Sequence, residues 1–184
     1  ARELIQAGEI GEILRFRGIH AEDYMSDPSV SWSWRLDPEN GGGAIVDLGS
    51  HIVARARYLV GPISEVAADL TTLVRARPVA TGSHEMRRVE VDDEARALVR
   101  FSQGAVGTLE ANWAATGRKM HLACEITGSR GAILLDMERM NEMRLFVCDG
   151  DPRRQGFVEI PAGPTHPDYA AFCPAPGHQL GFNE

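Results

Sequence analysis

The chain has 184 residues, enough for one domain that buries a substantial core. Its content of 43% hydrophobic and 24% charged residues is ordinary for a soluble globular protein. The net charge of -7 argues against nucleic acid and anionic membranes as partners, because both favour a basic protein surface.

The first predicted element is the end of a helix at residues 1–7, which Gly8 stops. Residues 11–20 alternate between apolar and polar side chains and predict a strand. Residues 21–40 show little periodicity, so we expect a loop that tryptophan side chains anchor.

A second helix is predicted at residues 44–60, after three glycines and before a Gly-Pro pair. It carries Asp47 and His51 four residues apart, so both side chains project from one face of the helix. That face lies about 100–140° away from the apolar stripe that would pack on a sheet. A carboxylate beside an imidazole can move a proton near neutral pH, and the sequence therefore predicts a catalytic pair.

Two other interpretations of this pair stay open. Asp47 would lie in the first helical turn, where a carboxylate stabilises the helix dipole, and His51 would be its half-exposed partner. An Asp-x3-His pair could also supply two metal ligands from one helical face. No third or fourth ligand is evident in the sequence, so we expect no metal site here.

Beyond residue 63 the pattern changes to short β-prone segments that tight turns join. The predicted strands cover residues 64–75, 91–101, 105–113, 119–127, 132–135, 143–148 and, as an edge, 156–160. Consecutive strands with short turns indicate an antiparallel meander, and one helix with many strands indicates an α+β layer pair. Residues 77–88 are expected to form a flexible insertion, and the Pro- and Gly-rich tail at 161–184 is expected to wrap the surface.

Three features of the sequence bear on cellular location. No apolar run approaches the ~20 residues that are needed to span a bilayer. The N-terminal residues lack the basic and then apolar profile of a signal peptide. The three cysteines form no CxxC pair, which indicates reduced thiols rather than a disulfide framework. A cytoplasmic protein is therefore expected.

Several polar and aromatic residues could contact a small-molecule ligand. Trp34 and Arg35 could line a sugar site, because aromatic rings stack on sugar faces and arginine donates hydrogen bonds; a tryptophan that pins the loop to the helix fits equally well. Tyr24 and Asn112 lie at segment ends, where they could reach a ligand, and His178 lies in the tail. Ordinary surface or turn positions are expected for His20, His84, His121 and His166.

The most distinctive motifs are Ile5 to Gly11, Trp34-Arg35, Gly41-Gly42-Gly43, Asp47 to His51, Tyr58-Leu59 with Gly61, Val91-Asp92-Asp93, Phe101 to Ala105, Thr127 to Gly131 and Gly177 to Phe182. Together they resemble the hallmark of the Gfo/Idh/MocA oxidoreductases, which include glucose–fructose oxidoreductase and myo-inositol 2-dehydrogenase. The resemblance covers nearly the whole chain. The glycine-rich turn with Asp-x3-His is its most specific part.

The resemblance implies a two-domain enzyme. A Rossmann domain would bind NAD or NADP, and an α+β domain like the C-terminal domain of dihydrodipicolinate reductase would carry an open, mainly antiparallel sheet with a helix packed on one face. Hydride would pass between C4 of the nicotinamide and a hydroxyl-bearing carbon of a sugar, inositol or related polyol. The resemblance further implies that His51 is the general acid/base, that Asp47 orients it or the substrate hydroxyls, and that a lysine from a Glu-Lys-Pro motif assists.

The chain departs from this family pattern in one large way. It has no GxGxxG after a strand and no Glu-Lys-Pro, and Lys119 lies too far downstream to replace the family lysine. We therefore expect residues 1–10 to be the end of a truncated Rossmann domain. Residues 11–184 would be the substrate-binding and oligomerisation domain with its last helix cut off, inactive alone.

Apolar side chains on two faces of the strands call for a cover on each face. One face is expected against the helix, and Val66, Leu70 and Leu98 are expected on the other. A homodimer or homotetramer through the sheet would cover that second face, as the family resemblance also implies. The alternative is a non-catalytic ligand-binding or oligomerisation module that uses the open face of the sheet.

Overall fold

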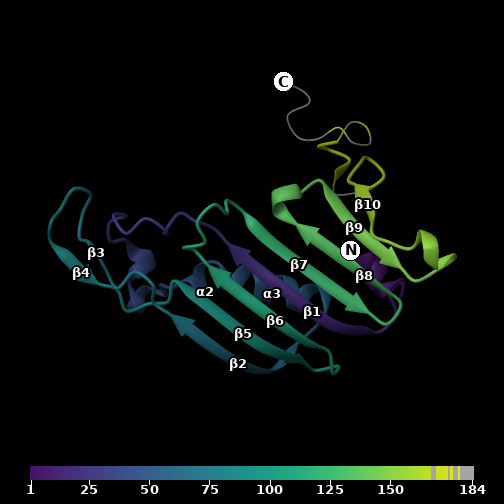
Figure 1. Cartoon of the computed structure of the whole chain (residues 1–184), viewed down its shortest axis with the longest axis horizontal. Helices are drawn as coiled ribbons and strands as arrows, with labels where there is room; N and C mark the ends of the chain where they lie inside the picture. The colour runs from purple at the N-terminus through teal and green to yellow at the C-terminus, as the bar shows by residue number, and fades with distance from the viewer. Residues whose placement is uncertain (167–168, 174, 176–177, 179–184) are drawn as a thin grey trace.

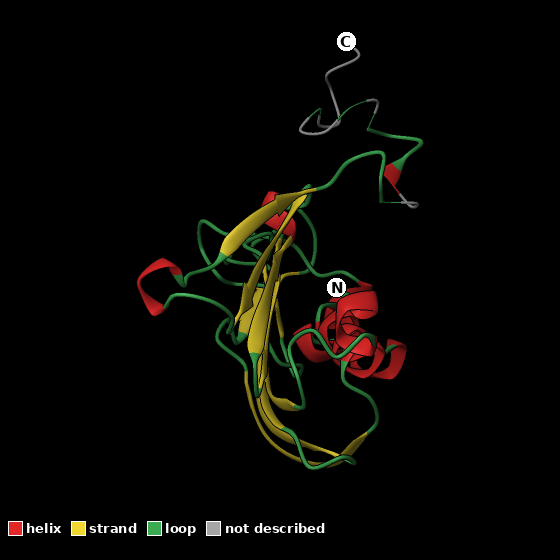
Figure 2. Ribbon diagram, turned by 90° about the vertical axis from the view of Figure 1, so that its right-hand side faces the viewer, coloured by secondary structure: helices red, strands yellow, loops and turns green. Residues whose placement is uncertain are grey.

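The computed structural model describes residues 1–166, 169–173, 175 and 178. One large sheet forms the centre of the molecule (Figure 1), and the α-helices lie together on one of its faces (Figure 2). In the described part of the chain, the opposite face carries no α-helix (Figure 2). This arrangement confirms the predicted α+β class with an open sheet.

Eight strands form the large sheet, in the order β10-β9-β8-β7-β1-β6-β5-β2. Their bounds are β1 (Ile13–Ala21), β2 (Ile63–Thr71), β5 (Glu94–Phe101), β6 (Val106–Asn112), β7 (His121–Gly128), β8 (Gly131–Asp136), β9 (Glu142–Val147) and β10 (Val158–Pro161). All neighbouring strands are antiparallel except β1 and β6. The predicted meander is therefore confirmed as two runs that flank one parallel pair, so the sheet is mixed rather than wholly antiparallel.

The parallel pair follows from the path of the chain. After β1 the chain crosses the sheet through helices and enters β2 at the far edge, as a crossover connection requires. It then returns through β5 and β6, reversing direction twice, and β6 lies beside β1 in the same direction. The sequence pattern shows where these strands occur but does not show which strand pairs with β1.

The predicted helix at 44–60 is divided into α2 (Ala44–Asp47) and α3 (Gly49–Leu59). Helix α3 packs against β1 and β6, and Ile52 is fully buried in the main apolar core. A glycine in β1 permits this close approach: a Cβ atom at Gly18 would lie 2.6 Å from the Ile52 side chain. The helix layer is thus seated directly on the middle of the sheet.

A second, small sheet replaces the expected flexible insertion at 77–88. Strands β3 (Ala76–Pro78) and β4 (Met86–Arg88) form an antiparallel pair, which Figure 1 shows beyond the α2 end of the large sheet. Arg77 is fully buried between backbone carbonyl groups, so the expectation of flexibility was wrong for the start of this segment. The low periodicity of this segment therefore does not indicate flexibility, because contacts with distant residues hold Arg77 in place.

The other elements of the described chain are short. They are α1 (Arg2–Gln6) and the 3-10 helices η1 (Trp34–Leu36), η2 (Pro38–Asn40), η3 (Met137–Arg139) and η4 (Pro152–Arg154). The predicted stop after the first helix is confirmed by Gly8, which adopts a φ of 73°. No described helix is long and apolar enough to cross a membrane. Most of the matching tail segment, residues 177–182, lies outside the described residues.

The sheet register corrects the expected distribution of exposed apolar side chains. Val66 lies opposite Val99, and Leu70 lies opposite Ala95. Directly opposite residues project from the same face, and Val99 and Ala95 are buried on the helix side. Val66 and Leu70 therefore also lie on the helix side, near the edge of the sheet. Of the three residues expected on the open face, only Leu98 is there.

Candidate active site

The two predicted catalytic residues lie at the junction of the two short helices. Asp47 is the last residue of α2, and His51 lies in the first turn of α3. Asp92, just before β5, holds the start of α2: its carbonyl accepts the Ala44 N–H over 2.9 Å, and its Oδ2 accepts the Ile45 N–H over 2.8 Å. These contacts satisfy N–H groups that the helix itself leaves unpaired, and they fix where Asp47 lies.

The carboxylate of Asp47 binds two of the residues predicted to contact a ligand. The Tyr24 hydroxyl donates to Oδ2 over 2.6 Å, and Arg35 donates from Nε to the same oxygen over 2.9 Å. Burial, followed by the hydrogen bond to Asp47, raises the pKa of Tyr24, and the hydrogen bond to Asp47 raises the pKa of Arg35. A protonated phenol and a permanent cation therefore hold this carboxylate in place.

The contacts of Asp47 leave one side of the carboxylate available. Among the described residues, no donor reaches its Oδ1. Trp34 extends the group toward solvent: the guanidinium carbon of Arg35 lies 4.5 Å from the centre of its ring, and 55% of the Trp34 surface is exposed. The structure thus brings Tyr24, Trp34, Arg35 and Asp47 together.

His51 is exposed, and its ring contacts a second histidine rather than Asp47. The His51 and His20 ring centres lie 5.4 Å apart in an edge-to-face arrangement. In the described chain, no hydrogen bond or ion pair joins Asp47 to His51. The interpretation of His51 as the ion-pair partner of Asp47 is therefore not supported. The Asp47 side chain is partly exposed, and His51 lies one turn further along the chain, in the first turn of α3.

His20 was expected at the surface, and that expectation was wrong. It is 2% exposed, with Nδ1 3.0 Å from the carbonyl oxygen of Leu48 and Nε2 3.0 Å from Oε1 of Glu22. Both ring nitrogens therefore lie within hydrogen-bond distance of an oxygen atom. The sequence does contain a signal for this position, because His20 follows Phe16 and Gly18 on the alternating, helix-facing side of β1.

For the other two residues predicted to contact a ligand, Asn112 and His178, the structure gives contacts with the backbone. The side-chain oxygen of Asn112, at the end of β6, accepts the Ala114 N–H over 2.8 Å. The backbone N–H of His178 donates to Ala175, and its carbonyl oxygen accepts from the Cys173 thiol, in the tail after β10. Contacts of Asn112 and His178 with a ligand stay predictions.

A buried network supports the loop that carries Tyr24. The fully buried Arg77 donates to the carbonyl oxygens of Met25 and Asp27. The neighbouring Asp93, also fully buried, accepts from the Trp113 indole over 2.6 Å, and that indole lies edge-to-face with Tyr24. In the sequence, Asp93 stands out only as part of a motif. Its side-chain partners could not be predicted from that motif, because they lie 16 to 20 residues away: Arg77, Val74, Leu73 and Trp113.

Comparison with known proteins places this geometry in context. Levoglucosan dehydrogenase from Pseudarthrobacter phenanthrenivorans is 36% identical over 196 residues, which cover 100% of this chain and 50% of that protein. A solved structure of levoglucosan dehydrogenase in complex with NADH and levoglucosan is 37% identical, with a TM-score of 0.89 over 98% of this chain and 48% of that chain. The chain thus spans about half the length of these relatives.

More distant structures share the same fold. An inositol dehydrogenase homologue from Azotobacter vinelandii, solved with NAD+, has a TM-score of 0.79 at 21% identity, over 98% of this chain and 45% of that chain. At family level, the model described as the GFO/IDH/MocA C-terminal domain matches residues 1–134, well over half of the chain. The resemblance read from the glycine-rich turn and Asp-x3-His is therefore confirmed, and this chain belongs to the GFO/IDH/MocA oxidoreductase family through its C-terminal domain.

Proposed function

We propose that this chain is the substrate-binding and oligomerisation part of an NAD(P)-dependent oxidoreductase. The reaction would transfer hydride between the nicotinamide and a hydroxyl-bearing carbon of a sugar, inositol or related polyol. Family membership and the dehydrogenase names of its relatives support this class of reaction. The observation that carries the proposal is the Asp47 carboxylate, held by Tyr24 and Arg35 with one oxygen free, beside the exposed His51.

The residues of this chain would act on the substrate side of the reaction. His51 would take the proton of the reacting hydroxyl as its carbon loses hydride, and return it in the reverse direction. The free Oδ1 of Asp47 would accept a hydrogen bond from a substrate hydroxyl and so fix the sugar ring beside His51. Trp34 would offer an aromatic face to the apolar side of that ring.

The nicotinamide would supply the hydride acceptor or donor. The glycine-rich turn at residues 41–43 lacks the GxGxxG pattern, directly between a strand and a helix, that cradles a pyrophosphate. A dinucleotide would therefore be held mainly by residues outside this chain, and its choice between NAD and NADP would be made there. The lysine of the Lys-Asp-His set would also come from outside the chain, because Lys119 pairs with Asp23.

The test is the His51→Asn substitution in the intact oxidoreductase, assayed with inositols and aldoses. Loss of a positioned acid/base should lower kcat by about 100-fold or more and remove one limb of the pH–rate profile. The matched control is His84→Asn, because His84 is an exposed histidine in the β3–β4 turn. It should keep the wild-type rate and pH profile.

Two results would overturn parts of this proposal. Unchanged turnover and an unchanged pH profile in His51→Asn would remove His51 from the mechanism. An intact protein that binds neither NAD nor NADP would overturn hydride transfer itself. That second result would favour the alternative, a non-catalytic ligand-binding or oligomerisation module.

The proposal includes self-association of the chain through the open face of the sheet. A depression of about 910 Å³ lies on it, over β1, β5, β6, β7 and β8. Leu98 on this face is 65% exposed, beside charged residues such as Arg96 and Glu110. A second copy of the chain, as a homodimer or part of a homotetramer, would remove this apolar surface from water. In the alternative, a non-catalytic module, the same depression would bind the ligand or the second copy.

A further inference from the structure

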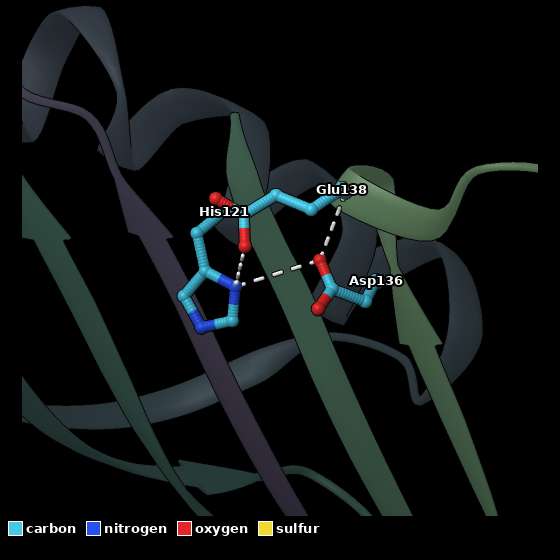
Figure 3. Close-up of side chains that lie close together, drawn as sticks. All are labelled: His121, Asp136 and Glu138. Carbon is cyan, nitrogen blue, oxygen red and sulfur yellow. Dashed lines mark hydrogen bonds and ion pairs between the residues drawn. The ribbon is translucent and has the colours of Figure 1, made fainter. Parts of the chain in front are cut away.

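A histidine and two carboxylates meet where β7 begins and β8 ends. His121 is the first residue of β7, Asp136 is the last residue of β8, and Glu138 lies in η3 directly after it. Figure 3 shows the His121 ring turned toward both carboxylates. Because Leu122 and Cys124 face the helix layer, alternation puts His121 on the open side of the sheet. This cluster is therefore separate from the Asp47–His51 region.

The three side chains converge through one ring nitrogen. His121 Nδ1 lies 3.4 Å from Oδ1 of Asp136 and 3.5 Å from Oε2 of Glu138. That nitrogen is shielded from solvent and makes no hydrogen bond to any residue that the structure describes. One ligand-type atom from each side chain lies within 4.8 Å of the others. A neutral ring with its proton on Nε2 would point its Nδ1 lone pair at two anions, an arrangement that a metal ion or a proton at Nδ1 would relieve.

These separations suit a tetrahedral metal ion. Zinc binds histidine nitrogen and carboxylate oxygen at roughly 2.0–2.2 Å, which places neighbouring ligand atoms about 3.3–3.5 Å apart. The two measured nitrogen–oxygen distances, 3.4 Å and 3.5 Å, are close to these edges. Two of the three edges between ligand atoms therefore match a tetrahedral zinc ion, and the third, between the two carboxylate oxygens, lies within 4.8 Å.

The charges around the cluster leave a negative excess. Arg118 contacts Oε2 of Glu138 over 2.7 Å and offsets one carboxylate. Lys119, the nearest other cation in sequence, is engaged by Asp23. Among the described residues, no lysine or arginine forms an ion pair with Asp136, and its side chain is 36% exposed, so water can reach the cluster as a further ligand.

We propose that His121, Asp136 and Glu138 form a binding site for a divalent ion of the zinc type, with water completing its coordination. The bound ion would join the start of β7 to the end of β8 and to η3. Its place on the open side of the sheet gives it a structural role, distinct from the proposed hydride-transfer site.

The test is a calorimetric titration of the chelator-treated and dialysed chain with ZnCl2. All proteins carry Cys148→Ser, because Cys148 is an exposed thiol that could bind zinc by itself. The expected result is one zinc ion per chain. In His121→Gln the affinity should fall by about 100-fold or more, since even outer residues of metal sites contribute 10–100-fold. His84→Gln, which removes an exposed imidazole elsewhere, should bind zinc like the parent.

A second variant protects the test against simple misfolding. Asp136 also accepts the Glu138 N–H over 3.0 Å and so caps η3. Asp136→Asn keeps an oxygen for that contact but removes the charge, so it should fold like the parent and bind zinc at least about 10-fold more weakly. Zinc should raise the melting temperature of the parent and leave that of His121→Gln unchanged.

Three results would contradict the proposal. The first is zinc binding no tighter than the binding of Mg2+, an ion that disfavours imidazole ligands. The second is an equal zinc affinity in the parent, in His121→Gln and in Asp136→Asn. The third is a zinc stoichiometry that falls as much in His84→Gln as in His121→Gln. The first of these would mean that a proton on His121, rather than a metal ion, bridges the carboxylates.

Discussion

The Asp47 carboxylate receives a phenol and a guanidinium on the same oxygen, and this asymmetry defines the candidate site at the scale of single residues. Hydrogen bonds to an ionised group are roughly twice as strong as neutral ones, so these two contacts orient the carboxylate firmly. Arg35 also lies against the Trp34 ring, a contact that the planar guanidinium of arginine favours and lysine would not reproduce. The free oxygen of Asp47 is thereby presented to a ligand.

The raised pKa of Tyr24 predicts that the free energy of unfolding decreases at alkaline pH. Burial raises the pKa of its folded-state phenol above the ordinary value of 10.0, which the unfolded chain keeps. Above about pH 10 the unfolded chain releases a proton that the folded chain retains, so the free energy of unfolding falls as pH rises. Tyr24→Phe should lack this contribution. Urea unfolding of both proteins between about pH 8 and 11 measures the difference.

The control for this prediction is Tyr58→Phe, because Tyr58 is 59% exposed and lies on the outer side of α3. Its stability should fall with pH in parallel with the wild type. If Tyr24→Phe also loses stability in parallel with the wild type, the phenol does not contribute as described.

At the scale of elements, the short helices depend on contacts that come from the strands. Helix α2 has only four residues and no side-chain cap of its own, and Asp92 from the segment before β5 takes that place. Gly43, which precedes α2, adopts a φ of 109°, and a Cβ atom there would collide with the Asp92 carboxylate. The segment before β5 therefore determines where α2, and with it Asp47 of the proposed catalytic pair, lies.

Asp92→Ala should lower the free energy of unfolding by about 1 kcal/mol, the usual effect of removing a capping side chain. Asp92→Asn is the control, because it keeps an oxygen for the Ile45 N–H. Burial raises the pKa of the Asp92 carboxyl, so a neutral amide should be tolerated well at this position. Urea unfolding at neutral pH compares the two. An equal loss in both variants would mean that charge, rather than the cap, is what matters.

Gly18→Ala tests how closely α3 packs against β1. Its new Cβ atom would lie 2.6 Å from the Ile52 and Phe16 side chains, so α3 or the Phe16 ring must move. Overpacking of this kind costs about 1–3 kcal/mol, which a thermal or urea unfolding curve would show. Gly156→Ala should be nearly neutral, because no atom lies within 4 Å of its Cβ position. A neutral Gly18→Ala would show that α3 is not tightly seated.

At the scale of the whole molecule, the two faces of the sheet have different roles. One carries the helix layer (Figure 2) and the proposed catalytic pair, and the other is open and holds the depression and Leu98. The His121 cluster (Figure 3) also lies on the open side. The register assigns Val66 to the helix side, although its exposure is similar to that of Leu98. These two residues therefore form a matched pair for testing which face self-associates.

Leu98→Arg should weaken self-association by at least about tenfold, because it puts a charge into the apolar part of the proposed interface. Val66→Arg places the same charge on the other face and should leave association unchanged. Sedimentation equilibrium of both variants measures the dissociation constants. A wild-type chain that is monomeric throughout, or equal weakening in the two variants, would argue against an interface on the open face.

Local periodicity was enough to find most elements and, of the candidate site, Asp47 and His51. Asp47 and His51 follow from a spacing of four on a helical segment, and the strands follow from alternation between tight turns. The same reasoning misjudged His20 and Arg77, because burial of a polar side chain depends on partners elsewhere in the chain. For His20 these partners include the Leu48 carbonyl, 28 residues away.

The sequence by itself determined the fold class, the position of the helical segment that contains Asp47 and His51, and the family, because each depends on short-range patterns. Only the tertiary structure decided that β1 pairs in parallel with β6, that Tyr24 and Arg35 meet on one oxygen of Asp47, and that His121 faces two carboxylates. The physical reason is that strand pairing and side-chain convergence minimise the free energy of the whole chain. No window of a few residues contains the partners that satisfy them.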